Sequence, residues 1–140
     1  MIAHQATCVA IGGRGLLIEG PPGSGKSSLA LALIDRGAAL VGDDGVLLES
    51  VGHHLIARPH PNTRGLIEVR NIGVLTMAAS TGAPLALVVL LDNAAPRFIE
   101  TAETVIRGGV HLPLIHLWPE SPVLHLRAEL ALDQYGLSLG

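Results

Sequence analysis

The sequence predicts an α/β phosphate-loop fold with a mixed, β-rich sheet and few helices. The strongest indication is a complete G-x-x-x-x-G-K-S motif over residues 20–27, which follows an apolar stretch and precedes a helical pattern. The second is a series of short apolar runs separated by glycine and proline, a pattern typical of strands joined by turns. Helical patterns are few, so we expect the sheet to dominate.

We expect the chain to begin with a β-hairpin that leads into the motif. Residues 7–11 and 16–19 are apolar strand candidates, and a glycine-rich turn separates them. The helix that leaves the motif covers residues 27–36 and is apolar nearly all round, which indicates burial on several sides. Gly37 follows it as a left-handed C-terminal cap.

Beyond this helix, the pattern predicts mostly strands. An acidic turn over 43–45 lies between strand candidates 39–42 and 46–49. The remaining strand candidates are 55–58, 66–70 and 85–91, and the remaining helix candidates are 97–107 and 126–135.

The composition limits the classes of partner. A length of 140 residues favours a single domain over residues 1–140. The 49% hydrophobic content is aliphatic, and Phe98, Trp118 and Tyr135 are the only aromatic residues, so we do not expect base stacking. A formal charge of -3 without a basic run argues against nucleic acid or an anionic membrane as partner.

A cytoplasmic location is expected. Cys8 is the only cysteine, which excludes an internal disulfide and fits a reducing compartment. The longest apolar run, residues 83–91, is far shorter than the roughly 20 residues needed to cross a bilayer. No basic region leads into an apolar stretch at the N-terminus, so we expect no signal peptide.

The motif at residues 20–27 predicts nucleotide binding. Its lysine is the only lysine of the chain, whereas eight arginines carry the other positive charges. A compact ammonium can reach between phosphate groups where a planar guanidinium is too wide. The serine hydroxyl would face Mg²⁺, and the helix N-terminus adds a partial positive charge. The predicted phosphate-binding residues are Gly20, Pro21, Pro22, Gly23, Ser24, Gly25, Lys26 and Ser27.

Two positions compete for the acidic role in phosphoryl transfer. Asp43 and Asp44 follow a strand candidate after the loop helix, where one carboxylate could organise the metal and the other accept a hydroxyl proton. Asp-Asp-Gly is also common turn chemistry. Asp92 ends the apolar run 87–91 as the Mg²⁺-organising aspartate of other phosphate-loop enzymes does, and the residues alone leave this choice open.

The order of these features resembles the catalytic domain of HPr kinase/phosphorylase, which has a phosphoenolpyruvate carboxykinase-like fold. His4 precedes the loop by about the family distance. Residues 37–44 are similar to the family's "RG..LVADD" segment, and residues 64–73 are similar to its "G.LEIRGLGI" signature. The resemblance covers residues 4 to 75, and it implies an ATP- and Mg²⁺-dependent protein serine kinase that phosphorylates the phosphocarrier protein HPr.

The resemblance also implies roles for individual residues. Lys26 would hold phosphate, and Asp44 would be the base towards the HPr serine. Metal contacts would come from Ser27 and Glu68, with assistance from Asp43. The set of implied catalytic residues is completed by His4, Arg70 and Arg97. Independently of the family, Glu68 and Arg70 lie two apart in a strand candidate, so their side chains share one face.

The sequence departs from the family pattern in two places. The family's usual N-terminal domain is not expected here, and Asn71 stands where a glycine normally follows the signature arginine. The family's basic "PV..GRN" segment is tied to the reverse, phosphate-driven reaction. Residues 114–121 correspond to it without arginine or lysine, which argues against phosphorylase activity. The resemblance further implies a homo-oligomer, a hexamer in the family.

Two other classes of function remain open from the residues. A small-molecule phosphate-loop kinase would also place an acid near a hydroxyl acceptor, but such kinases close an arginine-rich lid, and the chain has no cluster of two or three arginines. A non-catalytic nucleotide-binding module would keep the loop without needing Asp44. A turnover assay separates these classes.

Overall fold

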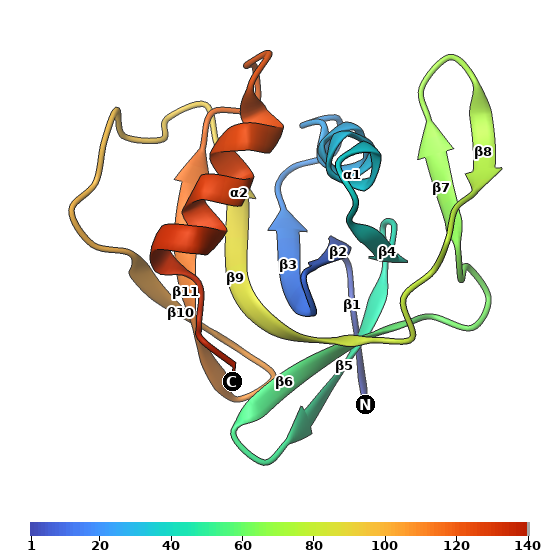
Figure 1. The fold of residues 1–140 in the computed structure, drawn as a ribbon, viewed down its shortest axis with the longest axis horizontal. Helices are drawn as coiled ribbons and strands as arrows, with labels where there is room; N and C mark the ends of the chain where they lie inside the picture. The colour runs from blue at the N-terminus through green and yellow to red at the C-terminus, as the bar shows by residue number, and fades with distance from the viewer. Residues whose placement is uncertain (140) are drawn as a thin grey trace.

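The computed structural model describes residues 1–139, and the predicted α/β fold with a β-rich mixed sheet and few helices is confirmed (Figure 1). The strands are β1 (Ile2–His4), β2 (Thr7–Ile11), β3 (Arg14–Glu19), β4 (Ala39–Gly42), β5 (Val46–Val51), β6 (His54–Pro59), β7 (Leu66–Val69), β8 (Gly73–Thr76), β9 (Ala83–Leu91), β10 (Glu103–Arg107) and β11 (Val110–Leu117). The helices are α1 (Lys26–Asp35) and α2 (Leu124–Tyr135).

Strand β9 is the centre of a nine-stranded sheet. It pairs in parallel with β3 on one side and with β11 on the other, and its first residues pair antiparallel with β6. The order continues from β3 through β2 to β4, and from β6 through β5 to β1. Because β9 has neighbours on both edges and is covered on both faces, it is almost continuously apolar, as buried parallel strands are.

The predicted hairpin before the phosphate motif is confirmed as β2 and β3, which pair antiparallel from Thr7 opposite Ile18 to Ile11 opposite Arg14. The motif therefore follows a strand that lies between β2 and β9, near the middle of the sheet. Side chains alternate along β3, so Leu16 and Ile18 face the helices while Leu17 faces the other way.

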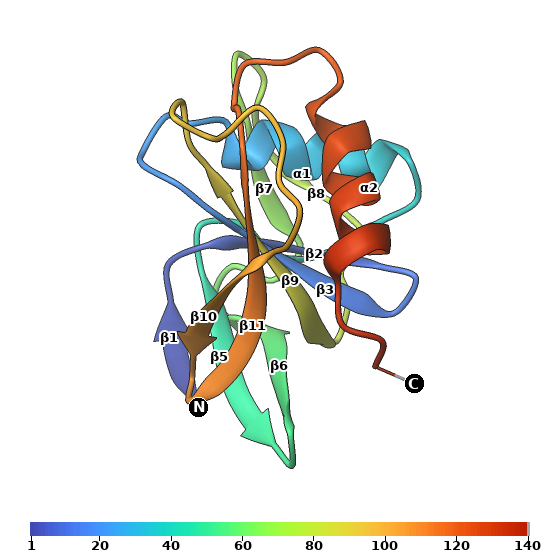
Figure 2. The ribbon, with the colours of Figure 1, turned by 90° about the vertical axis from the view of Figure 1, so that its left-hand side faces the viewer.

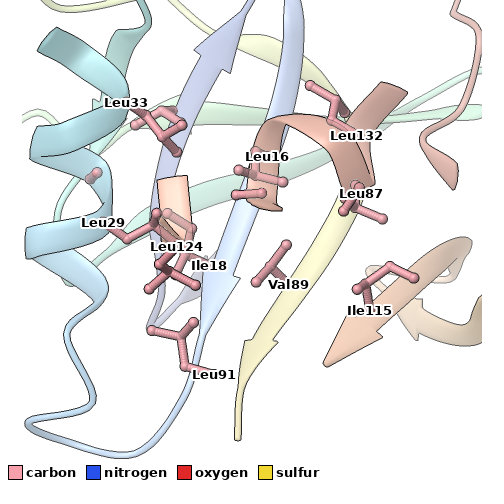
Figure 3. Packing of buried hydrophobic residues seen from close by; sticks show 14 of the residues in the cluster. Leu16, Ile18, Leu29, Leu33, Leu87, Val89, Leu91, Ile115, Leu124 and Leu132 are labelled. Atoms are coloured by element: carbon pink, nitrogen blue, oxygen red, sulfur yellow. The ribbon is translucent and has the colours of Figure 1, made fainter. Parts of the chain in front are cut away.

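Both helices cover the same face of the sheet. Figure 3 shows leucines of α1 and α2 meeting Leu16, Ile18 and Val89 of the sheet in one cluster. A second cluster fills the opposite face, where β5 and β6 curl beneath the central strands (Figure 2). Cys8 is buried in this second cluster, and burial raises the pKa of its thiol.

Glycines mark the two ends of α1. Gly25 precedes the helix at φ 99°, and Gly37 follows it at φ 109°. The N–H of Gly37 donates to the Ile34 carbonyl and the N–H of Ala38 donates to the Leu33 carbonyl, which is the Schellman cap that the sequence indicated. Leu29, Ala30 and Leu33 of this helix are buried.

The predicted helix over residues 97–107 is wrong. Residues 103–107 form β10, which pairs antiparallel with β11 through a two-residue turn at Gly108 and Gly109. Both glycines have positive φ, 53° and 79°, as a type I′ hairpin turn requires. The Gly-Gly pair and the β-branched residues before it were the available strand signals. Strands β1, β8 and β11 were also missed, whereas the C-terminal helix is confirmed and begins at Leu124.

Strands β7 and β8 form a separate two-stranded hairpin that stands beside α1, away from the main sheet (Figure 1). Every residue of β8 is exposed, whereas Ile67 of β7 is buried against the helix-side cluster. Within residues 1–139, neither helix has the length and apolar character that crossing a membrane would require.

Replacing Leu87 by alanine should lower the free energy of unfolding by about 3 kcal/mol, because its side chain is fully buried in the central strand and the loss leaves a cavity. Urea unfolding measures the change. Leu130→Ala is the matched control, since Leu130 is 62% exposed and should lose less than about 0.5 kcal/mol. Equal losses for the two variants would contradict the assigned core.

Candidate active site

A polar hollow of about 290 Å³ lies at the N-terminus of α1. It is bordered by the phosphate loop, by the turn after β4 and by the β7–β8 hairpin. These segments are distant in sequence, and the sheet brings them to one place. The lining residues are Thr7, Pro22, Gly23, Gly25, Lys26, Ser27, Ser28, Asp43, Asp44, Glu68 and Arg70.

The phosphate loop is tightly folded around its lysine. Lys26 Nζ donates to the carbonyls of Gly20 at 2.9 Å and Pro21 at 3.1 Å. A Cβ on Gly20 would lie 2.7 Å from Ser24 Oγ and 3.2 Å from the Leu91 Cβ, so only glycine fits beside the end of β9. Ser24 Oγ is buried and has no hydrogen-bond partner within residues 1–139. The loop thus has the compact shape that cradles phosphate groups.

Asp43 connects three segments of the site. Its Oδ1 accepts hydrogen bonds from Ser27 Oγ at 2.6 Å and from Thr7 Oγ1 at 3.1 Å. Its Oδ2 accepts the backbone N–H of Glu68 at 3.0 Å. Thr7 is fully buried, which makes this network rigid. Both carboxylate oxygens of Asp43 are therefore engaged, and the side chain is held next to the loop serine.

Asp44 has the opposite character. Its backbone is left-handed, with φ 60°, which aspartate tolerates better than most residues, and its N–H donates to Thr7 Oγ1 at 3.4 Å. Its exposed carboxylate accepts no hydrogen bond from residues 1–139 in this structure. Besides the polar hollow, Asp44 lines two further hollows together with His60. The Asp44 carboxylate is therefore accessible from the polar hollow and from the two hollows that His60 also lines.

The structure places the acidic pair and Asp92 in different surroundings. Asp92 does not line the polar hollow. Its Oδ1 accepts the N–H of Ala94 at 2.9 Å, and its Oδ2 lies 2.9 Å from His116 Nδ1. These two interactions, in that order of size, hold the pKa of Asp92 below its usual range. Asp92 ends its strand as a turn residue, and the carboxylates at the loop are Asp43 and Asp44.

Glu68 and Arg70 both line the polar hollow, as their shared face predicted. They come from β7 and the residue just after it, so the separate hairpin forms one wall of the site. Within residues 1–139, no salt bridge joins Glu68 to Arg70.

His4 and Arg97 lie outside the polar hollow. His4 Nε2 is 2.8 Å from Glu19 Oε2, and His4 lines one of the hollows that Asp44 also borders. It therefore lies beside Asp44 and contacts the residue that precedes the phosphate loop. Arg97 lines a different cleft next to α2 and does not meet the other predicted site residues.

Sequence reasoning missed the ion pair that anchors the strand before the loop. Arg107 donates to Glu19 through Nη2 at 2.6 Å and Nε at 2.9 Å. Burial acts to raise the pKa of Glu19, but the hydrogen bonds from Arg107 and His4 outweigh it and hold the pKa below its ordinary value. The Gly-Gly turn is a signal that places Arg107 on a strand. No local pattern in the sequence predicts its pairing with Glu19, because the two residues are 88 positions apart.

A glycine-rich loop between a central strand and a helix is the arrangement that phosphate-loop nucleotide-binding proteins share. The family model described as HPr Serine kinase C-terminal domain matches residues 1–87, and the chain belongs to this family.

The curated relatives carry the name HPr kinase/phosphorylase. The protein from Mycoplasma mycoides is 39% identical over 107 residues, covering 71% of this chain and 34% of the relative. The protein from an Exiguobacterium species is 38% identical over 101 residues, covering 66% and 32%. The chain thus spans about a third of the length of these relatives.

The similarity in structure extends beyond the matched family region. The solved HPr(Ser) kinase/phosphatase from Coxiella burnetii superposes with a TM-score of 0.83 at 28% identity, covering 95% of this chain and 90% of that one. The segments after residue 87, including β10, β11 and α2, therefore belong to the same fold.

Glu19→Gln should lower the free energy of unfolding at neutral pH by about 2 kcal/mol, because it removes the charge that Arg107 pairs with in a half-buried position. The pKa of Glu19 is lower in the folded than in the unfolded state. Its stabilisation is complete above the unfolded-state pKa, about 4.3, and is lost as pH falls through the folded-state pKa.

Urea unfolding of both proteins across the acidic range tests this. The difference between the wild type and Glu19→Gln should shrink as the pH falls. Glu49→Gln is the matched control, because Glu49 pairs with Arg58 near the surface and should change stability by less than about 1 kcal/mol. A Glu19→Gln effect that does not depend on pH would contradict the ionic origin of the stabilisation.

Proposed function

We propose that the protein is an ATP- and Mg²⁺-dependent protein serine kinase that phosphorylates an HPr-type phosphocarrier protein. The observation that supports this best is the division between the two aspartates. Asp43 is bound on both oxygens and holds Ser27, while the adjacent Asp44 presents a free carboxylate to the same hollow. Metal organisation and proton acceptance are thus assigned to different residues.

The phosphate loop would grip the nucleotide. Lys26 would exchange the carbonyls of Gly20 and Pro21 for phosphate oxygens, and the N-terminus of α1 adds its partial positive charge. Arg70 lines the opposite side of the hollow and would bring a second cation to the phosphates. The base of the nucleotide has no aromatic partner among the residues that line this hollow.

The oxygen atoms present fit Mg²⁺, a hard cation that takes oxygen ligands and often keeps only one or two protein carboxylates. Ser27 and Glu68 would hold it. Asp43 would act through Ser27. Because Asp43 accepts the hydrogen bond of the Ser27 hydroxyl, the lone pairs of that hydroxyl oxygen remain available to the metal. When bound, Mg²⁺ supplies charge neutralisation to the phosphate oxygens.

The acceptor hydroxyl would come to Asp44 from the side of the two hollows next to His60. As the oxygen of the acceptor serine bonds to the γ-phosphorus of ATP, the bond between that phosphorus and the β–γ bridging oxygen breaks. The hydroxyl proton of the acceptor serine passes to Asp44, and ADP leaves with the former bridging oxygen. His4, fixed by Glu19, borders this approach and would orient the acceptor. We do not assign Arg97 a role in this step.

HPr is proposed as the acceptor because the relatives are named for it. The proposal also includes the cytoplasmic location that the single cysteine and the short apolar runs favour, and the homo-oligomer that the resemblance implies. For the reverse phosphorylase reaction the expectation remains negative, because the stretch 114–121 carries no basic residue. Assaying HPr phosphorylation with ATP, and phospho-HPr cleavage with phosphate, covers both directions.

Asp44→Asn should reduce serine phosphorylation of HPr by about 10²-fold or more, because the amide cannot accept the hydroxyl proton. Affinity for ATP, measured by calorimetry, should stay within about threefold. Asp92→Asn is the control, since Asp92 lies outside the hollow, and it should keep most of the activity. Mass spectrometry of HPr measures the transfer.

Three outcomes would contradict this reading. An active Asp44→Asn variant would show that Asp44 is not the base. Phosphorylation of a metabolite with HPr left unmodified would favour a small-molecule kinase. Binding of ATP without any transfer by the wild type would favour a non-catalytic nucleotide-binding module.

Lys26→Arg should lower kcat/KM for ATP by about 10²-fold, close to the effect of Lys26→Ala. The ammonium lies within 3.1 Å of two loop carbonyls, and a planar guanidinium is too wide for that space. Steady-state kinetics with both variants test this. Full activity of Lys26→Arg would disprove the argument from the shape of the ammonium group.

A further inference from the structure

All three aromatic residues of the chain line hollows beside α2, outside the polar hollow at the phosphate loop. Trp118 lines a hollow of about 320 Å³, and Phe98 and Tyr135 line an adjoining hollow of about 240 Å³. Arg97 and Arg127 line both hollows. We call these hollows and their five residues the aromatic cleft. In a chain with so few aromatic residues, this gathering needs a physical explanation.

The aromatic cleft is built from rigid parts. It lies between α2 and the loop that follows β9, which runs beside β11 (Figure 2). The ring of Trp118 is fixed because its Nε1 donates to the Ala95 carbonyl at 2.6 Å. His116 forms part of the wall, and Asp92 and Glu103 hold it at 2.9 and 2.7 Å. The cleft is therefore formed before any ligand arrives.

The charges in the aromatic cleft have one sign. Arg127 lies 5.9 Å from the centre of the Trp118 ring, so its guanidinium is oriented by the indole. Within residues 1–139, no salt bridge joins Arg97 or Arg127 to a carboxylate, whereas Arg14, Arg36, Arg58 and Arg107 each have such a partner. No aspartate or glutamate lines either hollow, although the chain carries a formal charge of -3.

Exposed apolar surface accompanies these cations. Phe98 is 78% exposed and Trp118 is 40% exposed, which is costly for residues that could have been buried in the core. A ligand with an apolar body would cover these rings, and a phosphate or carboxylate group would satisfy the two guanidinium groups. The volume suits a small molecule.

We infer that the aromatic cleft binds a small organic anion, with its phosphate or carboxylate group on Arg97 and Arg127 and its aromatic or aliphatic body against Phe98, Trp118 and Tyr135. This site is distinct from the polar hollow, because the two share no lining residue. The inference goes beyond the proposed kinase function and does not depend on it.

Trp118 is the only tryptophan, so its fluorescence reports on the aromatic cleft alone. Phenyl phosphate and benzoate are the probes, and inorganic phosphate and phenol supply the charged head and the ring separately. At least one of the two probes should change Trp118 emission with saturation, whereas inorganic phosphate and phenol should bind about tenfold more weakly or not at all. Which probe binds more tightly distinguishes a phosphate from a carboxylate ligand.

Arg97→Ala and Arg127→Ala should each weaken binding of that probe about tenfold, because each removes a charge-assisted hydrogen bond. Calorimetry measures this without relying on the emission of Trp118, which loss of Arg127 can itself alter. Arg64→Ala is the matched control, since Arg64 is exposed elsewhere, and it should bind as the wild type does. Saturating ATP and Mg²⁺ should leave the affinity unchanged within about twofold.

Several results would overturn the inference. If neither probe shows saturable binding, or if Arg64→Ala weakens binding as much as Arg97→Ala and Arg127→Ala do, the aromatic cleft is not an anion site. Competition by ATP would show that the probe binds at the phosphate loop instead. A Phe98→Ala variant that dissociates an oligomer, with neither probe bound by the wild type, would identify the surface as a protein interface.

Discussion

The hydrogen bond between Ser27 and Asp43 is the interaction on which the rest of the site depends. It ties the first turn of α1 to the end of β4, and the same carboxylate accepts the Thr7 hydroxyl and the backbone N–H of Glu68. The Asp43 side chain thereby joins strand β2, helix α1 and the β7–β8 hairpin. Both oxygens of Asp43 are engaged, whereas the carboxylate of the neighbouring Asp44 is exposed and accepts no hydrogen bond from residues 1–139. Two adjacent residues of the same type thus have different surroundings, and the proposed division of roles between them rests on this difference.

The sheet makes that interaction possible. Strands β3 and β9 run in parallel through the middle of the molecule, and their inner residues support both helices on one face. The loop leaves β3 where Gly20 passes close to Leu91, so the position of the phosphate-binding backbone is set by the end of β9. On the other side, Arg107 and His4 hold Glu19, the last residue of β3. The phosphate loop therefore starts from an anchored strand, which is what a binding site of fixed geometry needs.

Much of the site could be predicted because its signals are local. The motif, the capped helix, the hairpin before it and the acidic pair each occupy a few consecutive residues. The wrong helix over residues 97–107 has a physical cause, because a mixed pattern of apolar and charged residues fits either period, and the pairing of β10 with β11 decides between them. The resemblance implies a catalytic role for Arg97, and the structure places this residue in the loop after β9, next to α2.

By itself, the sequence determined that a sheet dominates the fold and to which family the chain belongs, and it predicted a phosphate loop around Lys26 and Ser27, since these follow from short motifs and periodic patterns. Only the tertiary structure decided that Asp43 rather than Asp92 meets Ser27, that Arg107 anchors Glu19, and that the three aromatic rings gather beside two arginines. The physical reason is that such contacts join residues far apart in the chain. Their free energy depends on distance and burial, which are properties of the packed sheet and helices and have no local pattern in the sequence.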